Sequence, residues 1–392
     1  MNDNIILLSH DEQQLRLNRV RQLMKQAAID ALLIADFANL YYLTGRVYSG
    51  YAYIGSRDGD QMYFVKRMEN LHGDGVVNIR KPEQMSESIL LDSPAAVGME
   101  LDLMSYNMVE RMRAIFPGAQ IKDCSALMRE VRAVKTDAEL QKLRRSGILH
   151  EGVYRRIPHL YREGMTDIEF EIEIEKALRL DGNLGQFRIS GDTMETHMGS
   201  LITGDNADVP SPYDFAMGGA GLDPSIPTGA CGELIKPHCS VMVDLCGNFT
   251  GYMTDMSRTF ALESLEQLAL DAHQCSIDII DALMKLGKPV VAAADLYNTA
   301  MDMAKERGLH TYFMGHRQHA GFIGHGVGIE VNELPVIAPR SRDILQRHNV
   351  IALEPKFVIP HVGAVGIEST FIVQDDGLEC ITNAPTEIIS LT

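Results

Sequence analysis

The stretch VDLCGNFTGYMTDMSRTF, residues 243–260, indicates the fold of the C-terminal half of this chain. The apolar run Ser240–Leu245 predicts a buried strand, and Phe249–Phe260 predicts its partner. Residues 246–248, Cys-Gly-Asn, lie between them and suit a turn. The segment therefore predicts a β-hairpin within a sheet.

Two carboxylates lie in this hairpin, at Asp244 and Asp255. The hairpin could bring both to one end of the sheet. A carboxylate in an apolar strand costs free energy unless it is paired or bound to a cation. An ion pair of Asp244 with Arg258 would meet that need, and so would a metal ion. The hairpin alone leaves both alternatives open.

Three more residues of the metal-ligand type follow. His325 lies in GHGVG, where glycines allow a ligand to come close to the backbone. Glu354 and Glu368 lie in the apolar contexts IALEP and VGIES, where two buried acids close together need protons or a cation. Four carboxylates and one imidazole can hold two divalent cations that share a bridging hydroxide, a strong nucleophile at neutral pH. If they converge, the chain is a metal-dependent hydrolase with the ligands Asp244, Asp255, His325, Glu354 and Glu368.

The N-terminal 132 residues alternate helix and strand signals, which predicts an α/β domain. Ser9 and Glu12 form a capping-box pattern before a helix that runs to about Ala28. We recognise no cluster of catalytic residue types here, and we place the domain boundary near residues 132–137. The other expected elements are the strands Ala31–Ala35, Tyr51–Ile54, Met62–Val65 and Ala95–Met99, and the helix Ser105–Phe116.

Two further capping boxes, Thr136 with Glu139 and Thr166 with Glu169, open helices in the C-terminal part. Residues 190–232 are rich in Gly, Pro, Asp and Ser, and we expect a long irregular segment. The two capped helices should end at about Leu160 and Leu180; two more helices are expected at 265–286 and 293–307, and strands at 350–353, 358–359 and 365–373.

Composition excludes several classes of partner. The 392 residues carry a formal net charge of −17, which argues against nucleic acid or an anionic membrane as the main partner. The six cysteines are scattered without a CxxC pair, as expected for reduced thiols. No signal peptide or window of about 20 apolar residues is evident, so we expect a cytoplasmic protein without a membrane anchor.

Several segments together resemble the creatinase/aminopeptidase P/prolidase family, the pita-bread metallopeptidases. They are ALLIADFANLYYLTG, VRAVKTDAELQKLR, residues 243–260, GHGVGIE, LEPKFV and GIESTFIV, and they span nearly the whole chain. The resemblance implies an α/β (α+β) protein with a creatinase-like domain at residues 1–132 and a pita-bread catalytic domain at residues 133–392. It also implies a homodimer.

The resemblance further implies a role for each ligand. Asp244 would bind one metal, Asp255 and Glu368 would bridge two metals, and His325 and Glu354 would complete the set of ligands around the second metal. Two divalent ions are expected, with Mn²⁺ favoured and Zn²⁺ or Co²⁺ as alternatives. Glu354 would be the catalytic acid/base, with His325 beside it. Tyr252 and Arg258 flank Asp255 in the sequence. They would contact the metal ligands rather than the metal and so hold the ligands in place.

The chain departs from the family pattern at two histidines. The family carries a second histidine shortly after GHGVG, where this chain reads GIEVNE and has Asn332. It also carries a histidine before the first aspartate, and His197 is the only imidazole in that stretch. We assign Asn332 and His197 to substrate binding; an asparagine amide can donate to an oxyanion but cannot titrate.

Residues 206–221 could form a lid or one wall of the pocket, or a plain surface loop. For His316 and His319 we favour a surface position over a place in the pocket.

The leading expectation is a dinuclear hydrolase of the Xaa-Pro aminopeptidase or dipeptidase type, which cleaves short peptides with proline at the second position. One alternative is a small-molecule C–N hydrolase or lyase on the same scaffold, as in creatinase. A second alternative is a non-catalytic binding protein.

Overall fold

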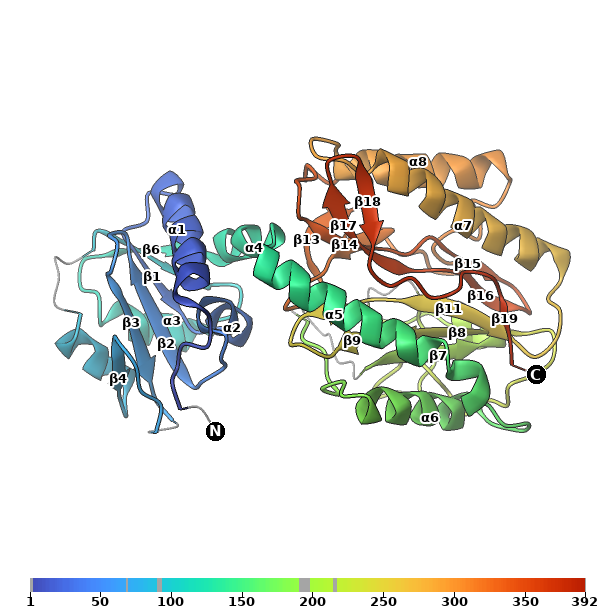
Figure 1. Ribbon diagram of the computed structural model, residues 1–392, viewed down its shortest axis with the longest axis horizontal. Helices are drawn as coiled ribbons and strands as arrows, with labels where there is room; N and C mark the ends of the chain where they lie inside the picture. Colours follow the sequence, from blue (N-terminus) through green and yellow to red (C-terminus); the bar gives the residue numbers. More distant parts are fainter. Residues whose placement is uncertain (1–2, 68–69, 90–93, 190–197, 214–216, 392) are drawn as a thin grey trace. The chain divides into compact units, whose positions relative to one another are not determined.

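The computed structural model describes residues 3–67, 70–89, 94–189, 198–213 and 217–391 (Figure 1). The chain forms two compact units, Met1–Arg132 and Ala133–Thr392. Each is described by itself.

The N-terminal unit is built on a six-stranded mixed sheet with the strand order β4-β3-β2-β1-β5-β6. The expected hairpin is present, since β2 and β3 pair antiparallel, whereas β1, β5 and β6 run parallel. All residues of β1 are fully buried, so both faces of the sheet are covered. The elements are α1 (His10–Gln26), β1 (Ala31–Ile34), α2 (Phe37–Thr44), β2 (Gly50–Gly55), β3 (Gln61–Val65), β4 (Val76–Asn78), η1 (Pro82–Glu87), β5 (Ala96–Met99), α3 (Tyr106–Arg113), β6 (Gln120–Asp123) and α4 (Ser125–Ala133).

The C-terminal unit contains a four-stranded sheet, β19-β11-β8-β7, and a five-stranded sheet, β13-β12-β14-β17-β18, with the short pairs β9–β10 and β15–β16. Its elements are α5 (Asp137–Tyr154), η2 (Ile157–Leu160), α6 (Asp167–Leu180), β7 (Gly199–Thr203), η3 (Gly204–Asp208), β8 (Ser240–Leu245), β9 (Gly247–Asn248), β10 (Met253–Thr254), β11 (Ser257–Ala261), α7 (Gln267–Leu286), α8 (Ala293–Glu306), β12 (Gly324–Gly326), β13 (Glu333–Ile337), β14 (Val350–Leu353), β15 (Lys356–Ile359), β16 (Gly363–Gly366), β17 (Ser369–Gln374), β18 (Gly377–Cys380) and β19 (Ile389–Ser390).

Two helix pairs cover the strands of this unit (Figure 1). Side chains of α5 and α6 pack with β8 and β11 in one apolar core. Side chains of α7 and α8 pack with β14, β15 and β17 in another. The strands therefore lie between α5–α6 and α7–α8, as the expected pita-bread fold requires.

Local sequence signals set the helix starts. Thr136 and Thr166 each accept a hydrogen bond from the backbone N–H three residues on, and the glutamates at those positions bond back. Both capping boxes predicted in this unit are therefore present, and at the third predicted position Ser9 Oγ accepts from the Glu12 N–H at 3.2 Å. The helix that begins after Thr136, α5, was predicted to run to about Leu160. It ends at Tyr154, and only the 3₁₀ turn Ile157–Leu160 follows it. Pro158 lacks an N–H, and its ring would clash with the carbonyl of Tyr154 in a continuous helix.

Three predictions for the strands and loops of this unit were wrong in part. Phe249–Phe260 is not one strand but contains two short ones, β10 and β11, of which only β11 pairs with β8. The predicted strand Val365–Val373 is interrupted at residues 367–368, between β16 and β17. Residues 190–232 contain the strand β7, which pairs with β8 and was not predicted. Periodicity cannot show such breaks, because hydrogen bonds from other sheets cause them.

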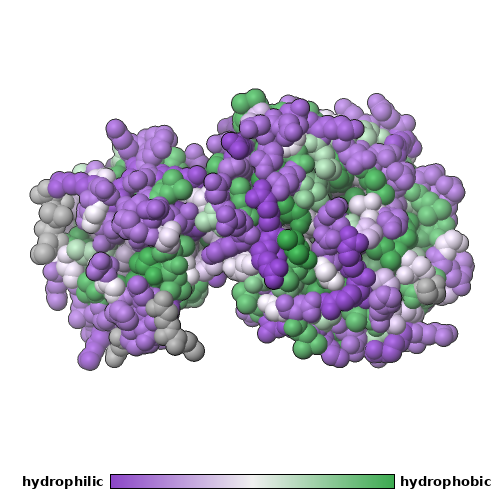
Figure 2. All heavy atoms as spheres, in the orientation of Figure 1, coloured by the Kyte–Doolittle hydropathy of each residue, from purple (hydrophilic) through white to green (hydrophobic). Residues whose placement is uncertain are grey.

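The surface of the chain is mostly hydrophilic on the face that Figure 2 shows, with apolar residues in smaller patches. Within the described ranges, no helix combines the length and apolarity that a bilayer crossing would require. All six cysteines are unpaired.

Candidate metal centre

The structure brings the five predicted metal ligands together. Asp244 lies on β8 and His325 on β12, whereas the other three lie where the chain passes from one strand to the next. Their ligand atoms form two groups, each with all atoms within 4.8 Å of one another. The first group is Asp255, His325 and Glu368, and the second is Asp244, Glu354 and Glu368.

The strand breaks position two of these acids. The backbone N–H of Asp255 donates to Thr370 Oγ1 at 2.7 Å, and that hydroxyl donates back to the Asp255 carbonyl at 2.8 Å. The Glu368 N–H donates to the Ser257 carbonyl at 3.1 Å, and Ser257 Oγ donates to Glu368 Oε2 at 2.6 Å. These bonds hold the segment around Asp255 against the break at Glu368, and oxygens of the two carboxylates lie within 4.8 Å of each other.

The glycines on either side of His325 allow neighbouring strands of the sheet to pack closely. A Cβ atom at Gly324 would lie 2.2 Å from the Ala352 carbonyl oxygen, and one at Gly326 would lie 2.2 Å from that of Leu334. The expectation that they let a ligand approach is therefore replaced by close packing of β12 against β13 and β14. Packing in this register directs the His325 imidazole towards the acids. The His325 side chain is 12% exposed there.

Arg258 is buried, but it does not pair with Asp244. Its Nη1 donates to the carbonyl oxygens of Glu368 at 2.5 Å and Ser257 at 2.8 Å. Its other nitrogens donate to the carbonyls of Thr382, Ala384 and Pro385 and to Ser369 Oγ. Arg258 thus holds the backbone at Glu368, in line with its expected supporting position.

Tyr252 is buried, and its hydroxyl donates to Glu139 Oε1 at 3.0 Å. This bond links Tyr252 to the first turn of α5. Its support of the metal ligands stays a prediction.

Sequence reasoning missed the residue that does pair with Asp244. Lys356 Nζ lies 2.7 Å from Asp244 Oδ2, 2.8 Å from Glu354 Oε2 and 3.0 Å from Glu368 Oε2. Its side chain is 0% exposed. The signal was present in the sequence, because Lys356 is the one charged residue of the apolar run KFVI, where an unpaired ammonium would be costly.

The electrostatics of the centre call for cations. Burial raises the pKa of Asp255 well above its ordinary value, and the charges of Glu368, Asp244 and Glu354 raise it further. Burial also raises the pKa of Asp244, against the opposing effect of Lys356. Burial by itself lowers the pKa of the Lys356 ammonium, but the surrounding carboxylates outweigh it and the net pKa lies well above the usual range.

The residues of the first group fit a divalent cation. His325 Nε2 lies 3.9 Å from Asp255 Oδ2 and 3.7 Å from Glu354 Oε1, too far for hydrogen bonds. An imidazole and carboxylates that converge without bonding one another suit Mn²⁺ or Zn²⁺. The second group is different, because the Lys356 ammonium already contacts all three of its acids.

The structure describes one of the two residues assigned to substrate binding. Asn332 is exposed, next to Glu333, which is buried and pairs with Lys135 at 3.0 Å. No contact of Asn332 with the five ligands is recorded in the described structure, so its role stays a prediction. His197 lies outside the described residues.

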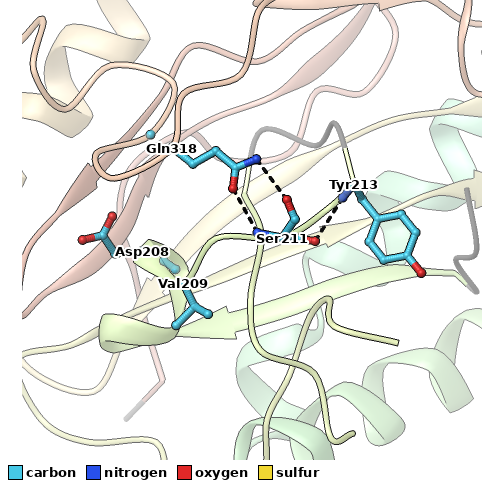
Figure 3. A pocket seen from close by; sticks show the side chains of 8 residues that line it. Asp208, Val209, Ser211, Tyr213 and Gln318 are labelled. Atoms are coloured by element: carbon cyan, nitrogen blue, oxygen red, sulfur yellow. Dashed lines mark hydrogen bonds between the residues drawn. The ribbon is translucent and has the colours of Figure 1, made fainter. Parts of the chain in front are cut away.

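The segment that follows β7 forms a wall of a small pocket (Figure 3). Ser211 N–H donates to Gln318 Oε1 at 3.0 Å, and Gln318 Nε2 donates to the Ser211 carbonyl at 2.9 Å. His316 is half-buried, with its Nδ1 2.8 Å from Asp208 Oδ2, and His319 is exposed; neither is among the residues that line this pocket, in line with the expected surface position. The enclosed space is only about 20 Å³, which holds roughly one water and no peptide.

Comparisons with known proteins agree with this geometry. Residues 141–375 match the model of metallopeptidase family M24, and residues 16–134 match that of the creatinase/prolidase N-terminal domain. The chain is 26% identical to the uncharacterized peptidase YqhT of Bacillus subtilis, over 96% of this chain and 100% of that protein. It is 25% identical to the Xaa-Pro dipeptidase of Pyrococcus furiosus, over 95% and 99% of the two chains.

Solved structures show the same fold. An Xaa-Pro dipeptidase from Bacillus anthracis superposes with a TM-score of 0.80 at 21% identity, over 96% of this chain and 99% of that chain. The prolidase from Pyrococcus horikoshii superposes with a TM-score of 0.78 at 20% identity, over 96% and 100% of the two chains.

Proposed function

Because the chain belongs to metallopeptidase family M24, we propose that it is a metal-dependent hydrolase of the Xaa-Pro dipeptidase or aminopeptidase type. Its substrates would be short peptides with proline at the second position. The observation that carries the proposal is the convergence of Asp255, His325 and Glu368, with Glu354 beside them, into a group able to hold a divalent ion. The relatives named Xaa-Pro dipeptidase support the choice of substrate.

A divalent ion held by these residues supplies Lewis-acid catalysis and activation of water at neutral pH. The chain supplies the proton transfer. Glu354 has one oxygen on Lys356 and the other directed towards His325, which leaves Oε1 to take a proton from the attacking water and return it to the leaving amine. Ser257 and Arg258 hold Glu368 in place through its carboxylate and its carbonyl.

The identity of the metal, the cellular location and the oligomeric state are part of the same proposal. Mn²⁺ is the favoured ion, because oxygen ligands with one imidazole suit it. We further propose a cytoplasmic homodimer, on the family resemblance alone. Light scattering of the purified chain would test the dimer, and a monomer at micromolar concentration would contradict it.

The direct test is a hydrolysis assay on Xaa-Pro dipeptides and tripeptides, each matched with its Xaa-Ala analogue, after loading with Mn²⁺, Co²⁺ or Zn²⁺. We expect turnover of the proline peptides, its loss with EDTA and its restoration by metal. Glu354→Gln should lower kcat by about 10²-fold or more. No turnover of any Xaa-Pro peptide under all three metals would sink the proposal.

A small-molecule C–N hydrolase or lyase is the second candidate. It is favoured by Asn332, which stands where the peptidases carry a histidine, and by the ammonium of Lys356 among the acids. A binding screen of proline peptides against amidino and betaine-like compounds separates the two functions. Binding of peptides alone excludes this candidate, and binding without turnover of either class would favour the non-catalytic alternative.

A further inference from the structure

Lys356 places a positive charge inside the acid cluster. An ammonium has three N–H donors, and each has a carboxylate acceptor here. The acceptors are Asp244 Oδ2 at 2.7 Å, Glu354 Oε2 at 2.8 Å and Glu368 Oε2 at 3.0 Å. The side chain is 0% exposed, so its hydrogen-bonding capacity is met entirely by these acids.

Those three acids form one of the two groups that could hold an ion. Divalent ions bind carboxylate oxygens at roughly 2.0–2.6 Å, so an ion shared by these oxygens would overlap with an ammonium only slightly farther from them. Lys356 cannot easily leave, because its backbone is paired with Gly366 in β15–β16 and its carbonyl accepts from Met314 at 2.8 Å. Withdrawal of its ammonium into the apolar core would leave a buried charge without acceptors, which is strongly unfavourable.

The other group remains open. None of the recorded contacts joins the Lys356 ammonium to Asp255 or His325 in the described structure. Glu354 faces both sides, with Oε2 on the ammonium at 2.8 Å and Oε1 3.7 Å from His325 Nε2. Glu368 belongs to both groups. One ion can therefore bind next to the ammonium and share Glu368 with it.

Charge does not oppose this occupancy. Four carboxylates with one ammonium and one divalent ion leave a net charge of −1, which is as close to neutrality as the +1 that a second divalent ion would give. The space that the ammonium fills therefore decides the occupancy.

We propose that the Lys356 ammonium takes the place of one of the two cations, so that this chain binds a single divalent ion through Asp255, His325 and Glu368, with Glu354 beside it. This deepens the proposed function, on whose metal-dependent centre it rests, and it differs from the sequence-based expectation of two ions. It concerns occupancy, which is measured without any substrate.

The test is metal stoichiometry of the full chain, by elemental analysis and titration calorimetry with Mn²⁺. The wild-type chain should bind about one ion, and Lys356→Ala, which opens the space, should bind about two. Lys356→Met removes the charge but keeps most of the volume, so it should stay at about one ion. Mn²⁺ electron paramagnetic resonance should show an isolated ion in the wild type and a spin-coupled pair in Lys356→Ala.

A matched pair of acid variants gives an independent check. Asp244→Asn changes only a partner of the ammonium and should retain the bound ion, whereas Asp255→Asn should lose it. Two ions in the wild type, or none, would overturn the proposal whatever the variants do. One ion in the wild type without turnover of Xaa-Pro peptides would leave this proposal standing and refute the proposed function instead.

Discussion

Two buried basic side chains, Lys356 and Arg258, organise the acids of the centre in different ways. Lys356 neutralises carboxylates directly, whereas Arg258 donates mainly to backbone carbonyls, including that of Glu368. A lysine could not replace the arginine, because its ammonium has fewer donors and no planar fork. The same positive charge therefore serves the charge balance at one position and the course of the backbone at the other.

We predict that Arg258→Lys lowers the free energy of unfolding by about 2–5 kcal/mol, because several buried carbonyl oxygens lose their donors. Urea unfolding followed by circular dichroism measures this. The matched control is Arg144→Lys, which alters a half-exposed pair with Glu379 and should cost less than about 1 kcal/mol. Equal losses in the two variants would contradict the role assigned to Arg258.

At the scale of elements, the acids lie where strands end. Asp255 precedes β11, Glu354 lies between β14 and β15, and Glu368 lies between β16 and β17. A side chain within a regular strand points to one face of its sheet, whereas one at a break can be directed between sheets. The breaks thus allow acids from separate sheets to meet.

The start of helix α5 is fixed by hydrogen bonds in its first turn. Thr136 accepts from the Glu139 N–H, and Glu139 accepts from the Thr136 N–H and from the Tyr252 hydroxyl. We predict that Thr136→Ala destabilises the chain by about 0.5–2 kcal/mol, measured by chemical unfolding. Thr136→Ser keeps the hydroxyl and should restore most of the loss; no recovery in the serine variant would mean that the methyl packing matters rather than the cap.

At the scale of the whole molecule, one buried acid outside the centre should shape stability against pH. Glu171 on α6 is 8% exposed and accepts from the Leu201 N–H at 3.1 Å. Burial, together with the charges of Glu175 and Asp167, raises its pKa from 4.5 to about 8. A raised acid pKa means that the folded chain binds the proton more tightly than the unfolded chain does.

The stability from this group is therefore full below pH 4.5 and is lost as the pH rises towards about 8. We predict that Glu171→Gln flattens this decline, and that its advantage over the wild type grows across the same window to at most about 3–5 kcal/mol. Urea unfolding at a series of pH values checks it. The exposed Glu163→Gln serves as the control, and identical pH profiles for wild type and Glu171→Gln would refute the prediction.

The sequence by itself determined what depends on neighbours along the chain. The caps at Thr136 and Thr166, the helices α7 and α8, and the strands β1, β8 and β14 lie close to their predicted positions. Local hydrogen bonds and hydrophobic periodicity fix such elements. Polar residues in apolar surroundings also singled out the four acids and the imidazole, because burial of such groups requires a partner.

Only the tertiary structure decided which partner each group has. Asp244 was expected to meet Arg258 or a metal, but it meets Lys356, which is 112 residues away in the sequence. The breaks at Asp255 and Glu368 likewise arise from Thr370 and Ser257 on other strands. The physical reason is that charge compensation and strand pairing depend on distances in space, and those distances exist only after the sheets have packed.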